Sequence, residues 1–195
     1  MKTDCGENYL RRYLDGDRDA FDGVLELYFD RLTFFINRQV RDVHTAEDIA
    51  IDTLLELLIH PKRYNFKTSL KTYLFSIAHN KSVNYLKRRC RVKLVDTAER
   101  ISPSGAPTES ESIEIASDEM SLEEQFVESE EYLALSRALG GLPADMRTAV
   151  HLVYFDEMTY KEAATVMKKS AKQLDNLLYR AKVRLKEELS EWDGR

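Results

Sequence analysis

TYKEAATVMKKSAKQLDNLLYRAKVRL, residues 159–185, contains two closely spaced helix-start signals. Thr159 and Glu162 form a T-x-x-E capping box, in which each side chain accepts a hydrogen bond from the other residue's backbone N–H. Ser170 and Gln173 repeat the arrangement as S-x-x-Q. The stretch therefore predicts two short helices joined by a tight turn.

The second of these helices has an apolar face and a polar face. The apolar positions recur at helical spacing and are Leu174, Leu177, Leu178, Ala181 and Leu185. The turn and the polar face carry Lys168, Lys169, Ser170, Lys172, Gln173, Asn176, Tyr179, Arg180 and Lys182. Asn and Gln pair bidentately with adenine in the major groove, and Arg and Lys pair with guanine. The stretch is typical of a DNA-binding helix-turn-helix, although any surface helical hairpin shares its caps and apolar stripe.

Charge is unevenly distributed along the chain. The whole chain carries a net charge of -5, but the segment from Val95 to Glu131 holds twelve acidic residues and only Arg100 as a base, which leaves +6 for the remainder. The same segment contains the Pro-, Gly- and Ser-rich run ISPSGAPTESESIEIASDE, which is typical of a linker. We therefore expect two mildly basic domains able to bind nucleic acid, residues 1–91 and 130–195, joined by a flexible acidic linker over residues 92–129.

Several classes of protein are not expected. The longest apolar run, residues 49–59, is too short and too acidic to span a bilayer, and the polar N-terminal segment does not resemble a signal peptide. A soluble, cytoplasmic protein is expected, with Cys5 and Cys90 as free thiols. The sequence has no Gly-rich phosphate loop, metal-ligand spacing or Ser-His-Asp set, so we expect no enzyme activity, no cofactor and no metal.

The apolar periodicity predicts an all-α fold of two small helical domains. Helices are expected over residues 17–40, 45–59, 68–91, 130–142 and 143–156, before the helix-turn-helix. Thr45 and Asp48 form a T-x-x-D start for the second helix, and Pro61 follows its end. No alternating pattern of useful length predicts a strand.

Cations and aromatic residues cluster around the third predicted helix. The loop before it carries Lys62, Arg63, Tyr64, Asn65, Phe66 and Lys67, and the helix carries His79, Asn80, Asn84, Lys87, Arg88 and Arg89. This mixture suits single-stranded DNA, because bases stack on rings while cations hold the backbone. Alternatively, one of the two aromatic residues fills the core and the basic run offsets the helix dipole. His79 has no second ligand at helical spacing, so we interpret it as a polar contact.

The second predicted helix has a different character. Asp48, Asp52 and Glu56 recur every four residues and form an acidic stripe beside Ile51 and Leu55. An acidic stripe repels DNA. It therefore either docks on a basic helix of a protein partner or is a solvated face.

Taken together, these features resemble the extracytoplasmic-function sigma factors of bacterial RNA polymerase. The first half is similar to their region 2 through DAFDGVLELYFDRL (19–32), AEDIAIDTLLELL (46–58) and FKTSLKTYLFSIAHNKSVNYLKRR (66–89). The second half is similar to their region 4 through residues 142–189. The resemblance covers nearly everything except the linker and the two ends.

The resemblance implies partners and roles. Asp48, Ile51, Asp52 and Leu55 would bind the clamp helices of the largest subunit of core RNA polymerase, and the polymerase flap would be a further contact. The loop at 62–67 and the helix residues from His79 to Arg89 named above would recognise the single-stranded −10 element of the promoter and trap an unstacked base. The set from Lys168 to Arg180 would read the −35 element as duplex. An anti-sigma factor is a further expected partner, and neither membrane insertion nor catalysis is implied.

This chain departs from the family pattern at several positions. Ile51 stands where the family usually has Gln, and Lys168 and Lys169 occupy a turn that usually holds Gly and an apolar residue. Within the reading helix, Asp175 replaces a frequent Lys and Leu177 a frequent Arg. These changes bear on the promoter sequence rather than on the class of protein.

Two other functions were weighed. A stand-alone helix-turn-helix regulator would bind duplex DNA as a dimer, and it would have no use for the loop at 62–67. A pure interaction protein that titrates an anti-sigma factor or polymerase would need neither the basic run nor the reading helix. A separate hypothesis is that the acidic linker folds back on the basic helices and weakens DNA binding by the free protein.

Overall fold

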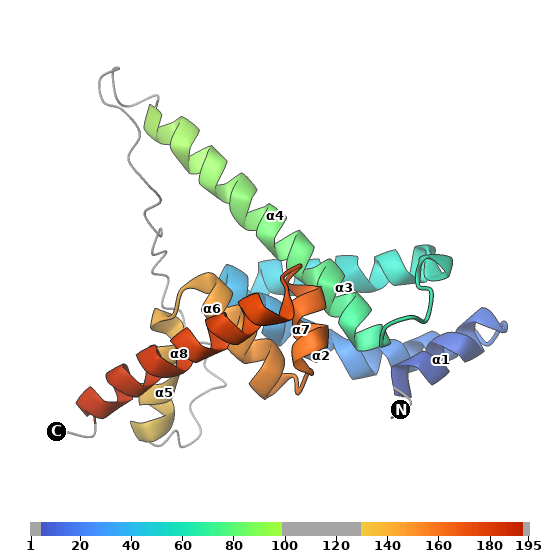
Figure 1. Cartoon of the computed structure of the whole chain (residues 1–195). Helices are drawn as coiled ribbons and strands as arrows, with labels where there is room; N and C mark the ends of the chain where they lie inside the picture. The colour runs from blue at the N-terminus through green and yellow to red at the C-terminus, as the bar shows by residue number, and fades with distance from the viewer. Residues whose placement is uncertain (1–4, 99–129, 193–195) are drawn as a thin grey trace.

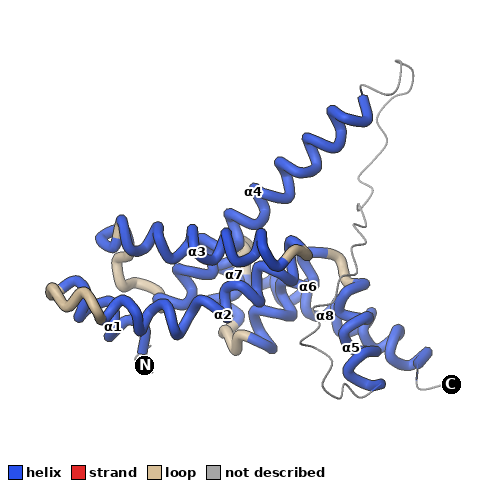
Figure 2. The backbone as a smooth tube through the Cα atoms, turned by 180° about the vertical axis from the view of Figure 1, so that it is seen from behind, coloured by secondary structure: helices blue, strands red, loops and turns tan. Residues whose placement is uncertain are grey.

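The computed structural model describes residues 5–98 and 130–192, and all regular structure in these ranges is helical (Figures 1 and 2). The first range forms α1 (Cys5–Leu14), α2 (Ala20–Val40), α3 (Val43–Ile59), the 3-10 helix η1 (Pro61–Arg63) and α4 (Leu70–Ala98). The second range forms α5 (Glu130–Gly141), α6 (Ala144–Val150), the π-helical turn η3 (His151–Phe155), α7 (Tyr160–Val166) and α8 (Ala171–Trp192). The prediction of an all-α fold is confirmed. Most of the predicted acidic linker, and with it the fold-back hypothesis, lies outside the described residues.

The core of the first range is enclosed by α2, α3 and α4. Its largest fully buried side chains include Tyr28, Phe35, Leu54 and Phe75. The rings of Phe35 and Phe75 pack with their centroids 4.9 Å apart and join α2 to α4. Burying each such side chain contributes roughly 1.5–3 kcal/mol to stability, which explains why the helical spacing of apolar residues predicts these three helices well.

The first helix, α1, has no counterpart among the predicted helices. Its polar sequence gives little periodic signal, yet Gly6 and Leu10 are buried against the rest of the domain. A Cβ at Gly6 would lie only 2.5 Å from the Tyr28 hydroxyl. The helix α1 can therefore pack this closely on α2 because Gly6 has no side chain. Close packing of this kind is invisible to a hydrophobicity pattern.

Several predicted boundaries of the first range are wrong, including the start of α2, which is Ala20 rather than residue 17. The helix α3 begins at Val43, because Asp42 is its N-cap and accepts a 2.7 Å hydrogen bond from the backbone N–H of Thr45. This hydrogen bond is the main reason why the pKa of Asp42 is lowered. At the other end, α4 runs on to Ala98, past its predicted end at Arg91.

The second range contains the predicted helix-turn-helix. Thr159 and Glu162 form the expected capping box at the start of α7. At the start of α8, the side chain of Gln173 accepts from the N–H of Ser170, and the Ser170 hydroxyl accepts in return from the N–H of Gln173. The helix predicted over residues 143–156 is interrupted, because α6 ends at Val150 and the chain continues as η3.

The described elements pack as one body. The helices α6 and α7 lie against α2 and α4, whereas the C-terminal half of α4 projects away from the other helices (Figures 1 and 2). Among the described residues, no helix is long and apolar enough to cross a membrane.

Candidate nucleic-acid and protein-binding surfaces

The reading face predicted on α8 is exposed. Exposed side chains include Lys168, Ser170, Lys172, Gln173, Asn176, Tyr179 and Arg180, whereas Lys169 is half-buried. Among the described residues, Tyr179 is the most exposed large apolar side chain, at 70%. Leu174, Leu178 and Ala181 are buried on the opposite side, as predicted. The structure therefore presents one polar face of α8 to solvent.

Two members of this face have additional structural duties. The carbonyl oxygen of the Gln173 side chain is engaged by the Ser170 N–H, which leaves the NH₂ group as the part of Gln173 able to donate to a base. The ammonium group of Lys169 lies 2.9 Å from the carboxylate of Asp145 in α6. Both interactions fix the entrance of the reading helix.

Lys168 adopts a left-handed backbone conformation, with φ of +53°. This is the position at which a helix commonly ends with Gly, because a Cβ is unfavourable there. The tight turn is therefore made by a lysine in a conformation that glycine would adopt more easily. Its side chain nevertheless remains exposed beside α8.

The prediction that Tyr64 contacts DNA is corrected by the position of its side chain. It is only 3% exposed, and its ring packs against Phe66 and Tyr73. Its hydroxyl donates to the carbonyl of Thr68 at 2.5 Å and lies 2.8 Å from a carboxylate oxygen of Glu7. Tyr64 therefore fills the core and is not available to stack on a base. This is the alternative role, core packing, that was expected for one of the two aromatic residues of the loop.

The rest of the loop faces outward. Lys62, Arg63, Asn65 and Lys67 are exposed, and Phe66 is half-buried. Phe66 has φ of +57°, and the guanidinium carbon of Arg11 lies 4.2 Å from its ring centroid. The cation–π contact with α1 holds the ring at the surface edge of the core.

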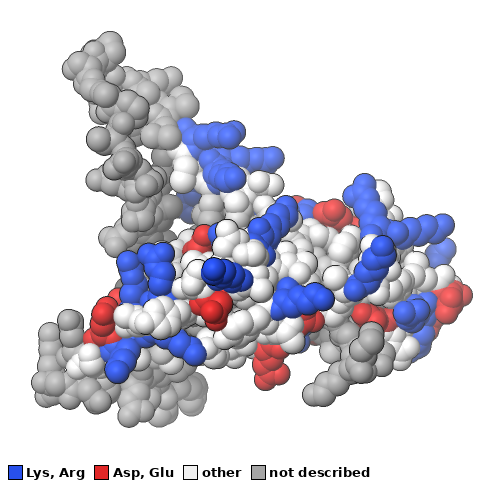
Figure 3. All heavy atoms as spheres, in the orientation of Figure 1, with Lys and Arg blue, Asp and Glu red and all other residues white. Residues whose placement is uncertain are grey.

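The predicted −10 residues on α4 fall into two groups. Asn84, Lys87 and Arg88 are exposed and Arg89 is half-buried, and Figure 3 shows Lys and Arg side chains gathered along the projecting part of the helix. His79 and Asn80 lie further back and are only half-buried. The Nδ1 atom of His79 is 2.9 Å from the side-chain oxygen of Gln39, and burial lowers the pKa of His79.

The acidic stripe on α3 borders a hydrophobic groove. Asp48, Ile51, Asp52 and Leu55 are all exposed, Ile51 by 45% and Leu55 by 42%. Ile51 and Leu55 line an open groove of about 600 Å³ between α2 and α3. The remaining lining residues are Arg18, Phe21, Asp22, Leu25, Glu26, Phe29, Asp30, Leu54 and Leu58. Apolar side chains thus form the floor and carboxylates much of the rim, as in a groove that receives an amphipathic helix.

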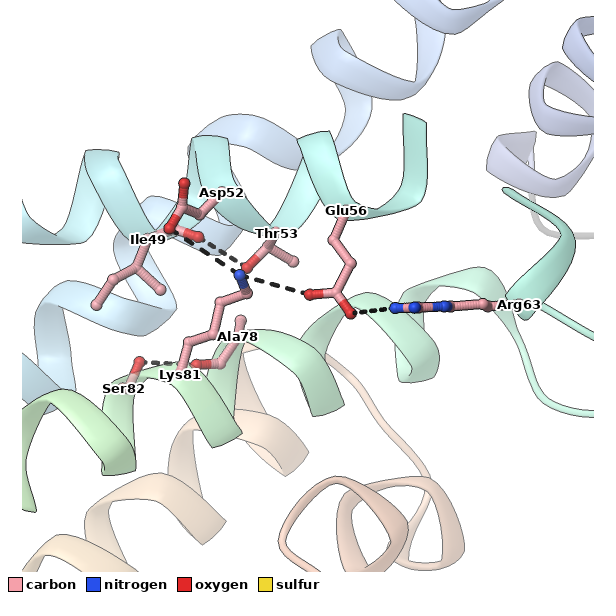
Figure 4. Close-up of polar contacts among 8 residues, drawn as sticks. All are labelled: Ile49, Asp52, Thr53, Glu56, Arg63, Ala78, Lys81 and Ser82. Atoms are coloured by element: carbon pink, nitrogen blue, oxygen red, sulfur yellow. Dashed lines mark hydrogen bonds and ion pairs between the residues drawn. The ribbon is translucent and has the colours of Figure 1, made fainter. Parts of the chain in front are cut away.

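Lys81 joins α4 to the acidic stripe and was not anticipated from the sequence. Its ammonium group lies 4.0 Å from Asp52 and 3.4 Å from Glu56, and Glu56 also lies 3.6 Å from Arg63 (Figure 4). The stripe is therefore partly neutralised by the helix that carries the predicted −10 residues. Only the tertiary arrangement of α3 and α4 reveals this link, because no local pattern connects Lys81 with Asp52.

Comparison with protein families gives two matches in chain order. Residues 24–92 match the model of Sigma-70 region 2, and residues 132–185 match that of Sigma-70 region 4. The first match contains α3, the loop at 62–67 and the proximal part of α4. The second contains the helix-turn-helix.

Individual relatives match over nearly the whole chain. The chain is 25% identical over 169 residues to the "ECF RNA polymerase sigma factor SigM" of Bacillus subtilis, covering 86% of this chain and 93% of that protein. It is 23% identical over 180 residues to "ECF RNA polymerase sigma factor SigW" of the same organism, covering 92% and 94% respectively.

Solved structures share the fold. The sigma factor RpoE of Bartonella quintana, solved with the anti-sigma factor NepR, matches with a TM-score of 0.61 and 24% identity over 88% of this chain and 98% of that one. The structure of CnrH with the cytosolic domain of CnrY matches with a TM-score of 0.63 and 17% identity, over 96% and 99% respectively.

Proposed function

The chain belongs to the extracytoplasmic-function group of sigma-70 factors, and we propose that it binds core RNA polymerase through the groove and stripe of α3 and directs it to promoters through α4 and α8. The observation that carries this assignment is the pairing, in one chain, of an exposed acidic and apolar face on α3 with an exposed reading face on α8. A free-standing duplex-binding regulator has no need of the first face. We propose accordingly that the protein acts in the bacterial cytoplasm, together with core RNA polymerase.

We assign the polymerase contact to Asp48, Ile51, Asp52 and Leu55. The groove floor offers exposed apolar area, and burying it stabilises a complex by about 25 cal/mol per Å² before the costs of association. The carboxylates favour a partner helix with cations along its edge and accelerate encounter with it. The clamp helices of the polymerase are the partner that the family implies, and its flap is the proposed contact of region 4.

We assign −10 recognition to the exposed loop cations, to Phe66 and to the α4 residues from His79 to Arg89. The loop cations and the projecting basic run are suited to hold the phosphates of a single strand. Half-buried Phe66 is the aromatic residue of the loop with an accessible edge, so it replaces Tyr64 as the stacking candidate. We assign −35 recognition to the turn and exposed face from Lys168 to Arg180, entering the major groove of duplex DNA.

The test is run-off transcription with core RNA polymerase from the bacterium that encodes the chain, on fragments of its genome. We expect specific starts that depend on the added protein. Leu55→Ala should weaken binding to core at least tenfold, because truncating a central buried anchor costs about 1.4 kcal/mol or more. Asn80→Ala should leave core binding intact and abolish or reduce the starts.

Two matched variants control for general damage. Asp15→Ala removes an exposed acid outside α3, and Asn8→Ala removes an exposed amide from α1. Both should transcribe like the wild type. The proposal is wrong if core polymerase neither binds the protein nor gains new starts while the protein still shifts duplex DNA.

A further inference from the structure

The helix α1 contacts the loop that is proposed to recognise the −10 element. The two segments lie side by side (Figures 1 and 2). A carboxylate oxygen of Glu7 lies 2.8 Å from the hydroxyl of Tyr64. One turn later in α1, the guanidinium carbon of Arg11 lies 4.2 Å from the ring centroid of Phe66. Glu7 and Arg11 are four residues apart, so both contacts come from the same side of α1.

Other contacts fix α1 to α2. The rings of Tyr13 and Phe21 pack with their centroids 5.2 Å apart. At Gly23 of α2, a Cβ would lie only 2.6 Å from a ring carbon of Tyr9. Together with the close approach at Gly6 described above, these contacts hold α1 firmly on α2. The loop is therefore contacted by a helix whose own position is set by the core.

The conformation of Phe66 has to be held by its surroundings. Its φ of +57° is a left-handed conformation that is rare for a bulky residue and costs free energy. Within the loop, the side chain of Asn65 accepts a 3.1 Å hydrogen bond from the N–H of Lys67, and the ring of Tyr64 has its centroid 4.6 Å from that of Phe66. Unlike these two interactions, the contact with Arg11 reaches the ring from outside the loop.

Arg11 has two ways to act on a DNA strand at this loop. Its side chain is exposed, and an exposed guanidinium can bind a phosphate. The geometry favours an action through Phe66, because the guanidinium lies over the ring at the distance of a cation–π pair. A ring that is held in one orientation loses less conformational freedom when a base stacks on it, so it binds that base more tightly.

We propose that Arg11 is a positioning residue for −10 recognition. It holds the ring of Phe66 in the orientation in which an unstacked promoter base stacks on it, and it acts through this ring rather than on the DNA. The proposal rests on the promoter-binding function assigned above. It gives α1 a part in promoter recognition, although α1 lies outside the residues 24–92 that match Sigma-70 region 2.

The first measurement tests whether Arg11 holds the loop in the free, full-length protein. Hydrogen–deuterium exchange is followed by mass spectrometry on a peptide that covers residues 65–69. The amides of Arg11→Gln should exchange about threefold faster than those of the wild type, which is the size of an exposed cation–π interaction.

Arg12→Gln is the matched control for this measurement. Arg12 is exposed like Arg11, lies in the same last turn of α1, and pairs with Asp17 rather than with a residue of the loop. Both substitutions remove one positive charge from the same end of the helix, so they change the interaction with the helix dipole alike. Arg12→Gln should exchange like the wild type.

The second measurement tests whether Arg11 acts through Phe66. Core RNA polymerase loaded with each variant is titrated with a fluorescent single-stranded oligonucleotide that carries the −10 sequence of a promoter found by run-off transcription. Phe66→Ala should weaken binding about tenfold, because stacking on the ring is lost. Arg11→Gln should weaken it about threefold, and Arg12→Gln should not change it. In combination with Phe66→Ala, Arg11→Gln should cause no further loss, since its effect passes through the ring.

The outcomes separate a positioning role from direct DNA contact and from general damage. A further loss of about threefold on top of Phe66→Ala would show that Arg11 contacts the DNA itself, and it would overturn the proposal. Arg11→Gln that matches Arg12→Gln in both exchange and binding would overturn it as well. The urea midpoint and the affinity for −35 duplex should be those of the wild type, and a loss of either in Arg11→Gln would count as damage to the fold and against a positioning role.

Failure of the proposed function would be distinguishable. If polymerase loaded with the wild-type protein does not bind the −10 strand, the promoter-binding function is wrong. Exchange in the free protein needs neither polymerase nor DNA, so it would still decide whether Arg11 holds the loop.

Discussion

Tyr64 and Phe66 are neighbours in the sequence, yet their surroundings differ. Tyr64 enters the core because its ring meets Tyr73 and its hydroxyl finds two oxygen acceptors, whereas the left-handed backbone at Phe66 turns the second ring toward Arg11. The sequence allowed two interpretations, that both rings serve DNA binding or that one of them fills the core, and it did not indicate which ring would do so. The hydrogen-bond partners of each side chain, which only the fold supplies, assign them different roles.

Tyr64→Phe should therefore destabilise the protein without a direct effect on DNA contacts. Removing the hydroxyl removes a part-buried hydrogen bond to the carbonyl of Thr68, which costs about 1 kcal/mol. Urea denaturation of the full-length protein measures this loss. Tyr179→Phe removes a hydroxyl from a 70% exposed ring and should change stability by less than about 0.5 kcal/mol. Equal effects of the two substitutions would contradict the assignment of Tyr64 to the core.

At the scale of the element, the helix-turn-helix is the part best predicted from sequence. Its two capping boxes are local signals, so residues three apart suffice to define each start. The start of α3 was misplaced because the local sequence offers two possible N-caps. The prediction used Thr45, whereas the structure uses Asp42. The helix α1 and the break at η3 depend on packing between elements, and no local pattern indicates them.

A substitution of Lys168, in the turn before α8, should change the stability of the fold and the affinity for DNA in opposite directions. Lys168→Gly should raise the free energy of unfolding by about 1 kcal/mol, because glycine adopts the left-handed conformation without a Cβ clash. It should also lower affinity for duplex DNA and reduce the salt dependence of binding by about one phosphate contact. Lys168→Gln is the control: it removes the same charge and keeps the Cβ, so it should lower affinity without the gain in stability. A gain of equal size in Lys168→Gln would show that charge, not backbone conformation, governs the turn.

At the scale of the whole molecule, the sequence predicted the two halves and their order but not their contact. The only contact hypothesised from the sequence was that of the acidic linker with the basic helices, since the charge of the linker is visible in composition. The structure instead brings the helix-turn-helix half onto α2 through contacts that involve Arg41, His151 and Asp156. These residues are far apart in the chain and belong to no motif, so their proximity cannot be inferred from spacing. The residues proposed for the polymerase surface on α3, by contrast, were all placed on one exposed face by their helical period.

The stability of the fold should depend on pH through His79. Its pKa is lowered in the folded protein, chiefly by burial, whereas Asp145 acts in the opposite sense and Lys168 and Lys169 reinforce the shift. The folded protein therefore binds fewer protons at this site than the unfolded chain, in which His79 has its ordinary pKa of about 6.5. The contribution of neutral His79 to the free energy of unfolding is fully present above about pH 6.5 and falls as the pH drops below that value. Urea denaturation at pH 7.5 and pH 5.5 should show a loss of stability at the lower pH, and His79→Gln should reduce that loss. A wild-type loss identical to that of His79→Gln would exclude His79 as the source.

The ion pairs of Lys81 make the charge on the exposed face of α3 unequal between the two ends of the helix. Glu56, near the end of the helix, is compensated by both Lys81 and Arg63, whereas Asp48, near its start, forms no ion pair with any of the described residues. The acidic stripe that borders the groove is therefore compensated near Glu56 and keeps its negative charge near Asp48. A helix that brings its cations to that end fits in one orientation, and the reversed helix loses the attraction while keeping the same apolar contact. Lys81 on the neighbouring helix thus allows the groove to distinguish the two orientations in which a partner helix could bind.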